Sequence, residues 1–256
     1  MSRPRNPPSL KELLGQALKG GGEKPVAFVL AGHNGSGKTT LWHERLVSML
    51  QIPLVNADRL TASILPPIDS KTRKLPSWAQ ALRDDDVRWQ SLSQEAVRAF
   101  MSLIVEKRMP FALETVFSHW RKKGPKLYES KIDDILKLQS AGYFVVLLFV
   151  GLSSNGLSVL RVATRRAQGG HDVPLPKLLS RFPRTQRAIG LAAPVADMTL
   201  MFDNSRTPGK AFALVRAQKR KKLLFDCRDR NYHVDRELRG IASLWLDKVA
   251  PQSAQV

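Results

Sequence analysis

The chain has 256 residues, of which 43% are hydrophobic and 25% charged, and 41 Lys and Arg against 22 Asp and Glu leave a net charge of +19. This composition is typical of a globular protein with anionic partners, either polyanions or small molecules. The longest apolar run, 143–152, is too short to span a bilayer, and residues 1–24 contain no apolar stretch typical of a secretion signal. With one cysteine, Cys227, no internal disulfide forms. We therefore expect a cytoplasmic protein without a membrane segment.

The predicted elements alternate between strands and helices along the chain. Residues 1–24 are rich in Pro, Gly and basic residues, so we expect a flexible basic N-terminal arm. After it, short apolar runs predict strands and amphipathic stretches predict helices. We expect strands at 25–31, 52–55, 110–115, 143–150 and 198–203, and helices at 39–50, 87–106, 126–139, 156–168 and 175–189.

Apolar strands separated by helices predict an α/β fold with three layers, in which helices cover both faces of a mostly parallel sheet. This domain is expected over residues 25–205. The stretch 59–86 holds three prolines and mixed charges, and is interpreted as an insertion on the substrate side. Residues 206–256 are interpreted as an appended basic helical extension, which carries four consecutive cations at 219–222.

The first strand leads into a motif that binds phosphate groups. Residues 32–39 fit the pattern G-x-x-x-x-G-K-[ST] at every fixed position, and the expected strand before and helix after it supply the required context. The glycines let backbone N–H groups point into one concavity, the lysine reaches the β and γ phosphates, and the Thr39 hydroxyl can ligate Mg²⁺. The predicted nucleotide-binding residues of this P-loop are Gly32, Asn34, Gly35, Ser36, Gly37, Lys38, Thr39 and Thr40.

Carboxylates follow the next two strands. Asp58 comes after the second strand with Asn56, and Glu114 with Thr115 ends the third. Ligands of open α/β sheets bind at this edge, so Asp58 is a candidate general base and Glu114 a candidate ligand of Mg²⁺ or substrate hydroxyls. The alternatives are an exposed acid or helix cap at Asp58 and a salt bridge at Glu114.

A hinged, arginine-bearing lid is predicted around residues 161–184. Arg161 and Arg165 share one face of a helix, and Gly169 and Gly170 end that helix before a second one begins. Closed over a nucleotide, such a lid places guanidinium groups against the charge of the transferring phosphoryl group. A solvated basic face is the alternative.

Together these residues resemble the zeta toxin family of P-loop kinases. The most specific part of the resemblance is Gly-Gly-His-Asp-Val-Pro at 169–174 with the arginines before it. The resemblance is carried by 31–40, 56–58, 113–115, Arg161 with Arg165, 169–174, Arg181 with Arg184, and 203–205.

The resemblance implies a kinase that uses ATP or GTP and Mg²⁺ to phosphorylate a hydroxyl of a nucleotide sugar such as UDP-N-acetylglucosamine, with an antitoxin protein as a partner in bacteria. Asp58 matches the catalytic base of the family, and Lys38, Arg161 and Arg165 are the other implied catalytic residues. Asn204 joins the nucleotide-binding residues and Thr39 is the implied metal contact. The implied substrate-binding residues are Asn56, Glu114, Thr115, Arg121 and Arg181.

Two other functions remain open. In the first, the chain is a polynucleotide 5′-hydroxyl kinase whose basic segment 206–239 holds a phosphate backbone and whose Trp120 or Tyr128 stacks on a base. In the second, the chain binds nucleotide or nucleic acid without catalysis, and Asp58 has no chemical role.

Overall fold

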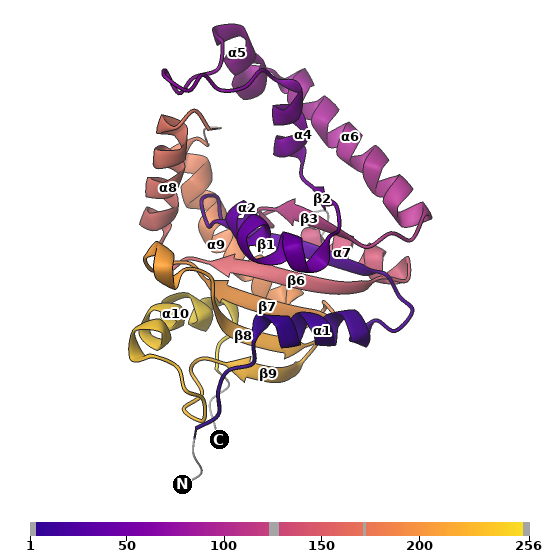
Figure 1. Ribbon diagram of the computed structural model, residues 1–256, viewed down its shortest axis with the longest axis vertical. Coiled ribbons are helices and arrows are strands. Elements are labelled where there is room, and N and C mark those ends of the chain that lie inside the picture. The colour runs from indigo at the N-terminus through magenta and orange to yellow at the C-terminus, as the bar shows by residue number, and fades with distance from the viewer. Residues whose placement is uncertain (1–3, 123–127, 171–172, 253–256) are drawn as a thin grey trace.

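The computed structural model describes residues 4–122, 128–170 and 173–252, and a seven-stranded sheet lies at its centre (Figure 1). In chain order the strands of this sheet are β1 (Val26–Gly32), β2 (Leu54–Val55), β3 (Phe111–Thr115), β6 (Phe144–Gly151), β7 (Met198–Asp203), β8 (Ala213–Lys219) and β9 (Lys222–Asp226). Their order across the sheet is β2-β3-β1-β6-β7-β8-β9. The first five of these pair in parallel, and β8 and β9 continue the sheet in antiparallel pairs.

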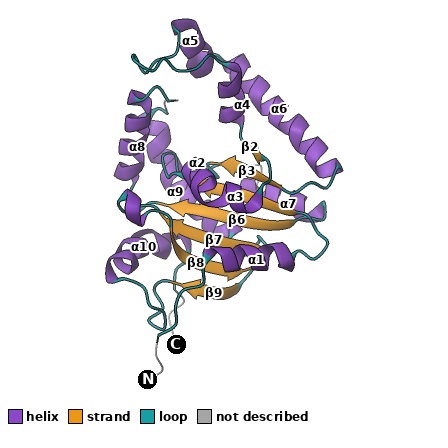
Figure 2. Cartoon of the chain, in the orientation of Figure 1, coloured by secondary structure: helices purple, strands orange, loops and turns teal. Residues whose placement is uncertain are grey.

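Helices cover both faces of the sheet. In Figure 1, α1 (Leu10–Gly20) and α2 (Lys38–Leu41) lie in front of it, and α7 (Lys131–Ser140) and α9 (Leu175–Ala192) lie behind. Figure 2 shows the same strands between helical layers. Every residue of β1, β6 and β7 is buried, which explains why these strands are continuous apolar runs. The prediction of a three-layer α/β fold with a mostly parallel sheet is confirmed.

The remaining elements surround this core. In Figure 1, α4, α5 and α6 stand beyond one side of the sheet and α8 beyond the other. None of the helices in the described ranges combines the length and apolar character that crossing a membrane requires. These elements are the π-helix η1 (Trp42–Leu46), α3 (Val47–Leu50), α4 (Ala57–Ile64), α5 (Ser77–Asp85), α6 (Val87–Glu106), the hairpin β4 (Trp120–Lys122) and β5 (Tyr128–Ser130), α8 (Asn155–Ala167), the 3₁₀-helix η2 (Pro208–Lys210) and α10 (Arg236–Val249).

The predicted flexible arm is wrong for residues 10–20. These residues form α1, whose N-terminus is closed by a capping box: the Ser9 hydroxyl accepts from the backbone N–H of Glu12, and the Glu12 carboxylate accepts from that of Ser9. Leu13 and Leu14 are buried in the main core. A cap and an apolar face therefore fix a helix where the Pro- and Gly-rich composition suggested a loose segment.

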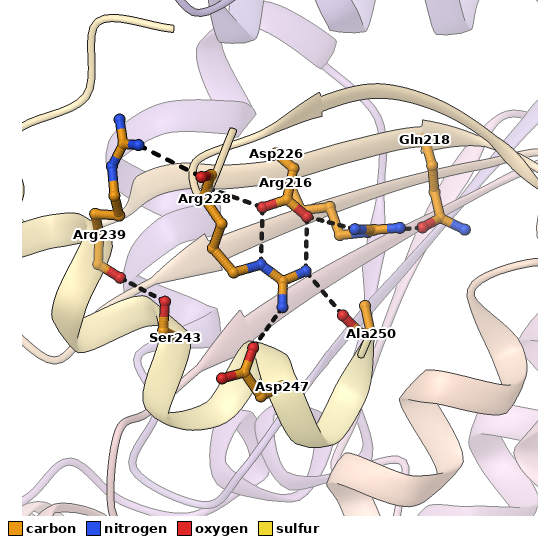
Figure 3. Close-up of polar contacts among 8 residues, drawn as sticks. All are labelled: Arg216, Gln218, Asp226, Arg228, Arg239, Ser243, Asp247 and Ala250. Atoms are coloured by element: carbon orange, nitrogen blue, oxygen red, sulfur yellow. Dashed lines mark hydrogen bonds and ion pairs between the residues drawn. The ribbon is translucent and has the colours of Figure 1, made fainter. Parts of the chain in front are cut away.

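The predicted helical extension is also wrong for most of its length. Residues 213–226 form β8 and β9, and only the last part forms a helix, α10. Buried Asp226 accepts two hydrogen bonds from Arg228, at 2.9 and 2.7 Å, and an ion pair from Arg216 (Figure 3). Arg228 also reaches Asp247 of α10 at 2.6 Å, which ties that helix to the sheet. Burial raises the pKa of Asp226, but the bonds and charge of Arg228, with Arg216, outweigh this and lower it.

The helix predicted at 126–139 begins only at Lys131. Ser130 occupies its N-cap, where the hydroxyl accepts from the N–H of Ile132 and the backbone N–H donates to Asp133. The residues before it belong to β5. The predicted insertion at 59–86 contains most of α4 and all of α5.

Candidate active site

The P-loop joins the end of β1 to the start of α2. Gly35 and Gly37 have positive φ angles of 69° and 91°, a conformation that L side chains rarely adopt. Space is also restricted, because a Cβ at Gly37 would lie 2.5 Å from Nδ2 of Asn204, and one at Gly35 would lie 3.0 Å from the carbonyl oxygen of Ser158. Both glycines are therefore required by backbone conformation and by close packing.

The loop contains polar groups that the protein itself does not satisfy. Ser36 Oγ is buried and has no hydrogen-bond partner within the described ranges. A buried hydroxyl without a partner is costly, and in a phosphate-binding loop it is available to donate to a phosphate oxygen. This unpartnered group fits the predicted nucleotide-binding role of Ser36.

The ammonium group of Lys38 is buried at the centre of the site. Its Nζ donates to the carbonyl oxygens of Gly32 at 3.2 Å and His33 at 3.0 Å. Burial lowers the pKa of Lys38. Among its charged neighbours, Glu114 and Asp58 raise this pKa, whereas Arg165 and Arg181 lower it further. Four side chains that the sequence placed in one site, two acids and two arginines, therefore act on the same buried cation.

A carboxylate connects the P-loop to the neighbouring strands. The parallel register pairs Leu30 of β1 with Glu114 of β3, next to the loop. Thr39 Oγ1 donates to the Glu114 carboxylate, 3.0 Å from each oxygen, and Asn56 Nδ2 donates to Oε2 at 2.7 Å. Glu114 is therefore held by hydrogen bonds to Thr39 and Asn56.

Asp58 lies in the first turn of α4 with its side chain exposed. It does not cap this helix, because the N-cap is Asn56, whose side-chain oxygen accepts from the N–H of Arg59 at 3.2 Å. The helix-cap alternative for Asp58 is therefore wrong. Its carboxylate acts on both Lys38 and Arg181, which places it at the carboxylate side of the loop.

Helix α8 packs directly on the P-loop. Ser158 Oγ donates to the carbonyl oxygen of Asn34 at 2.7 Å, and a Cβ at Gly35 would lie 3.1 Å from Cβ of Arg161. Burial lowers the pKa of the half-buried Arg161, and Asp203 partly opposes this shift. Arg165 lies exposed one turn later on the same helix. Arg161 is thus at the loop, whereas Arg165 is further toward solvent.

The predicted lid joint is contacted by the insertion. Gly169 has a φ of 84° after the end of α8, and its carbonyl oxygen accepts from Arg83 of α5 at 2.9 Å. A Cβ at Gly169 would also lie 2.4 Å from the carbonyl oxygen of Arg73. His171 and Asp172 of the Gly-Gly-His-Asp-Val-Pro element lie outside the described residues. In α9, burial, together with the charge of Arg184, lowers the pKa of half-buried Arg181, which Asp58 opposes.

Three other predicted residues are placed less centrally. Thr115, at the end of β3, accepts from the N–H of Phe117 at 3.3 Å, and Thr40 is exposed on α2. The backbone of Arg121 pairs with Glu129 in the β4–β5 hairpin, and its side chain lies outside what the structure describes.

Residues after β7 complete the opposite side of the loop. Asn204, a predicted site residue, is buried and donates from Nδ2 to the carbonyl oxygen of Ser36 at 2.8 Å. The preceding Asp203 accepts from Nε1 of Trp245 in α10 at 2.9 Å. The ring of Phe212 contacts Gly37, where a Cβ would lie 3.1 Å from Cε1. The sequence gave no local signal for Trp245, Phe212 or Ser158, because each reaches the site through a contact that spans many residues of chain.

The family model described as Zeta toxin matches residues 12–193. The chain belongs to the zeta toxin family. The match includes the P-loop, Asp58, Glu114 and the arginines of α8 and α9, and confirms the resemblance. It ends before Asn204 and Phe212.

Two solved structures share the fold. The structure of AvrRxo1-ORF1:-ORF2 with ATP has a TM-score of 0.57 at 18% identity, over 96% of this chain and 73% of that one. The PezAT chromosomal toxin–antitoxin system of Streptococcus pneumoniae gives 0.51 at 14% identity, over 96% and 88%. No curated protein matches. By family and fold, this zeta toxin family member is a P-loop kinase, and the shared fold extends through the C-terminal strands that the family model does not include.

Proposed function

We propose that this zeta toxin family member transfers the γ-phosphoryl group of ATP or GTP to a hydroxyl group of a nucleotide sugar such as UDP-N-acetylglucosamine. The observation that carries the proposal is the position of Glu114, whose carboxylate is bonded to Thr39 of the P-loop and to Asn56. This arrangement sets an acidic, half-buried acceptor side directly against a phosphate-binding loop. A nucleotide-binding module without catalysis has no need of such a carboxylate.

The oxygen atoms at this position suit Mg²⁺. Magnesium takes hard oxygen ligands at about 2.0–2.1 Å in octahedral geometry, so adjacent ligands lie about 3 Å apart. Thr39 Oγ1 and the two Glu114 oxygens have this spacing, at 3.0 Å. Thr39 and Glu114 are the residues that would hold the ion, directly or through water. When bound, Mg²⁺ neutralises charge on the phosphate oxygens.

The residues of the chain then have distinct roles. The acceptor hydroxyl attacks the γ-phosphorus, its proton passes to the Asp58 carboxylate, the bond between the γ-phosphorus and its bridging oxygen breaks, and a nucleoside diphosphate leaves. Lys38 leaves its two carbonyl partners to meet the β and γ phosphates. Arg161 and Arg165 supply positive charge from α8. Because the transition state is loose, these groups act by position and charge rather than by a covalent bond.

The nucleotide sugar is supported by the family, in which the resemblance implies a UDP-activated amino sugar as acceptor. An antitoxin protein is the second partner that we propose, since the PezAT structure is titled as a toxin–antitoxin system.

The test is transfer of radiolabelled γ-phosphate from ATP into UDP-N-acetylglucosamine, other UDP-sugars and 5′-hydroxyl oligonucleotides. We expect labelled nucleotide sugar from the wild type. Asp58→Asn should bind ATP normally and lose about 10²- to 10⁴-fold in rate, because an amide accepts no proton. Asp85→Asn, an exposed Asp at the end of α5, is the matched control and should transfer at the wild-type rate.

Two results would contradict the proposal. Labelling of the oligonucleotide alone would replace the sugar by a polynucleotide as acceptor. An Asp58→Asn protein that turns over as fast as the wild type would remove Asp58 as the base.

A further inference from the structure

Phe212 is a half-buried aromatic residue beside the phosphate-binding loop. It lies between η2 and β8, next to Ala213, which pairs with Asp203 at the end of β7. A Cβ at Gly37 would lie 3.1 Å from Cε1 and 3.2 Å from Cζ of Phe212, so the ring packs against the N-cap of α2. One part of the ring joins the main core, and the residue as a whole remains partly exposed.

The backbone of Phe212 is strained. Its φ of 56° lies in the left-handed region, which glycine and asparagine adopt readily and a bulky aromatic residue does not. Such strain persists only where the surrounding structure enforces it, and it is concentrated at functional sites. A strained aromatic residue in contact with the P-loop therefore calls for a role of its ring.

The two sides of the loop differ in chemistry. The sheet places β3 and β2, with Glu114 and Asp58, on one side of β1, and β6, β7 and β8, with Asn204 and Phe212, on the other. In the proposed function the γ-phosphate points toward the carboxylates, where the acceptor lies. The triphosphate is a linear chain, so its nucleoside leaves the loop on the opposite side, where Phe212 lies.

We propose that Phe212 is a stacking surface for the base of the bound nucleoside triphosphate. This inference rests on the proposed function and adds to it a binding residue outside the family match. Stacking on an aromatic ring tolerates any base, because every base has a π face. Phe212 therefore contributes affinity for the nucleoside without selecting ATP over GTP.

The experiment compares two probes on the full chain, ATP and inorganic tripolyphosphate, each with Mg²⁺, by titration calorimetry. Tripolyphosphate occupies the loop but has no base. Phe212→Leu should bind ATP about 5- to 100-fold more weakly than the wild type and tripolyphosphate equally well. Phe212→Tyr keeps the ring and should bind both normally. Phe100→Leu, which alters an exposed aromatic residue of α6, is the matched control and should change neither affinity.

The outcomes separate this inference from the proposed function. A wild type that binds neither probe refutes the phosphate-binding site and the inference with it. Unchanged ATP affinity in Phe212→Leu, or an equal loss for both probes, overturns the stacking role alone, because the ring would then be dispensable or would only support the loop. Phe212→Trp decides the question should the leucine protein not fold: ATP, and not tripolyphosphate, should quench the additional fluorescence relative to the wild type.

Discussion

His33, the second residue of the P-loop motif, makes the stability of this protein depend on pH. Its ring is 2% exposed, stacks on Phe182 with centroids 3.9 Å apart, and meets the edge of Phe149 at 5.8 Å. Neither ring nitrogen has a hydrogen-bond partner in the part of the chain that is described. Burial, with the charge of Lys38, lowers the pKa of His33 from 6.5 to about 3.

The direction of the effect follows from proton binding. Below pH 6.5 the unfolded chain protonates His33, whereas the folded protein keeps it neutral down to about pH 3. The stability is therefore complete above pH 6.5 and falls as the pH decreases from 6.5 toward 3. One pH unit corresponds to about 1.4 kcal/mol, so about 2 kcal/mol of the free energy of unfolding should be lost between pH 6.5 and 5. Most carboxyl groups titrate below this window.

The perturbation is His33→Phe, which keeps a ring against Phe182 and removes the titrating group. Its free energy of unfolding, measured by urea denaturation at intervals from pH 7 to 5, should lack the loss that the wild type shows. His233→Gln, which changes an exposed histidine, should follow the wild type. Equal losses in wild type and His33→Phe would show that another group causes the acid sensitivity, and the reasoning from burial would fail.

Three further predictions concern the loop, the last helix and the basic run. Lys38→Ala should abolish phosphoryl transfer while the urea midpoint stays at or above that of the wild type, since a desolvated ammonium is removed. Trp245→Phe should lower stability by about 2 kcal/mol, through the lost hydrogen bond to buried Asp203, and should weaken ATP binding measured by calorimetry. Replacing the run 219–222 by alanine, apart from Arg220, should leave sugar phosphorylation nearly unchanged and reduce the salt slope of any nucleic-acid binding by roughly 0.7 to 0.9 per lost contact.

The sequence predicted the elements whose residues all share one environment. β1, β6 and β7 are buried on both faces, so each is a continuous apolar run that has no helical alternative of sufficient length. The P-loop was also predictable, because its glycines are required locally by backbone conformation. Glu114 could be placed near the loop because parallel strands end at one edge.

The strands β8 and β9 were missed because their pattern is mixed. β8 contains half-buried Arg216 and buried Gln218, which a hydrophobic pattern assigns to a surface. Both have partners: Arg216 pairs with Asp226, and Gln218 donates to the carbonyl oxygen of Arg220 at 2.8 Å. Such pairs are invisible in a single sequence, since the partner is recognised only after the strands are paired.

The site residues that were missed share the same cause. Trp245 reaches Asp203 across 42 residues, and its indole lies so close to Gly151 that a Cβ there would lie 2.5 Å from the ring. Nothing near Trp245 in the sequence indicates a phosphate-binding loop. The predicted boundary at residue 205 followed the last recognisable motif, whereas α10 and β8 support the loop from beyond it.

The position of the basic run bears on the polynucleotide alternative. β8 begins beside Asp203 at the P-loop edge and ends at Lys219, which pairs with Lys222 at the opposite edge of the sheet. Six residue steps of about 3.4 Å put roughly 20 Å between the two ends of this strand. Asp58 lies farther still, because it follows β2 at the other side of the sheet order. A nucleic acid bound to this run would have to cross the whole sheet to present a 5′-hydroxyl to Asp58. The positive charge of the run and the chemistry of the P-loop are therefore separable, and the acceptor must be recognised by groups near Asp58 and Glu114.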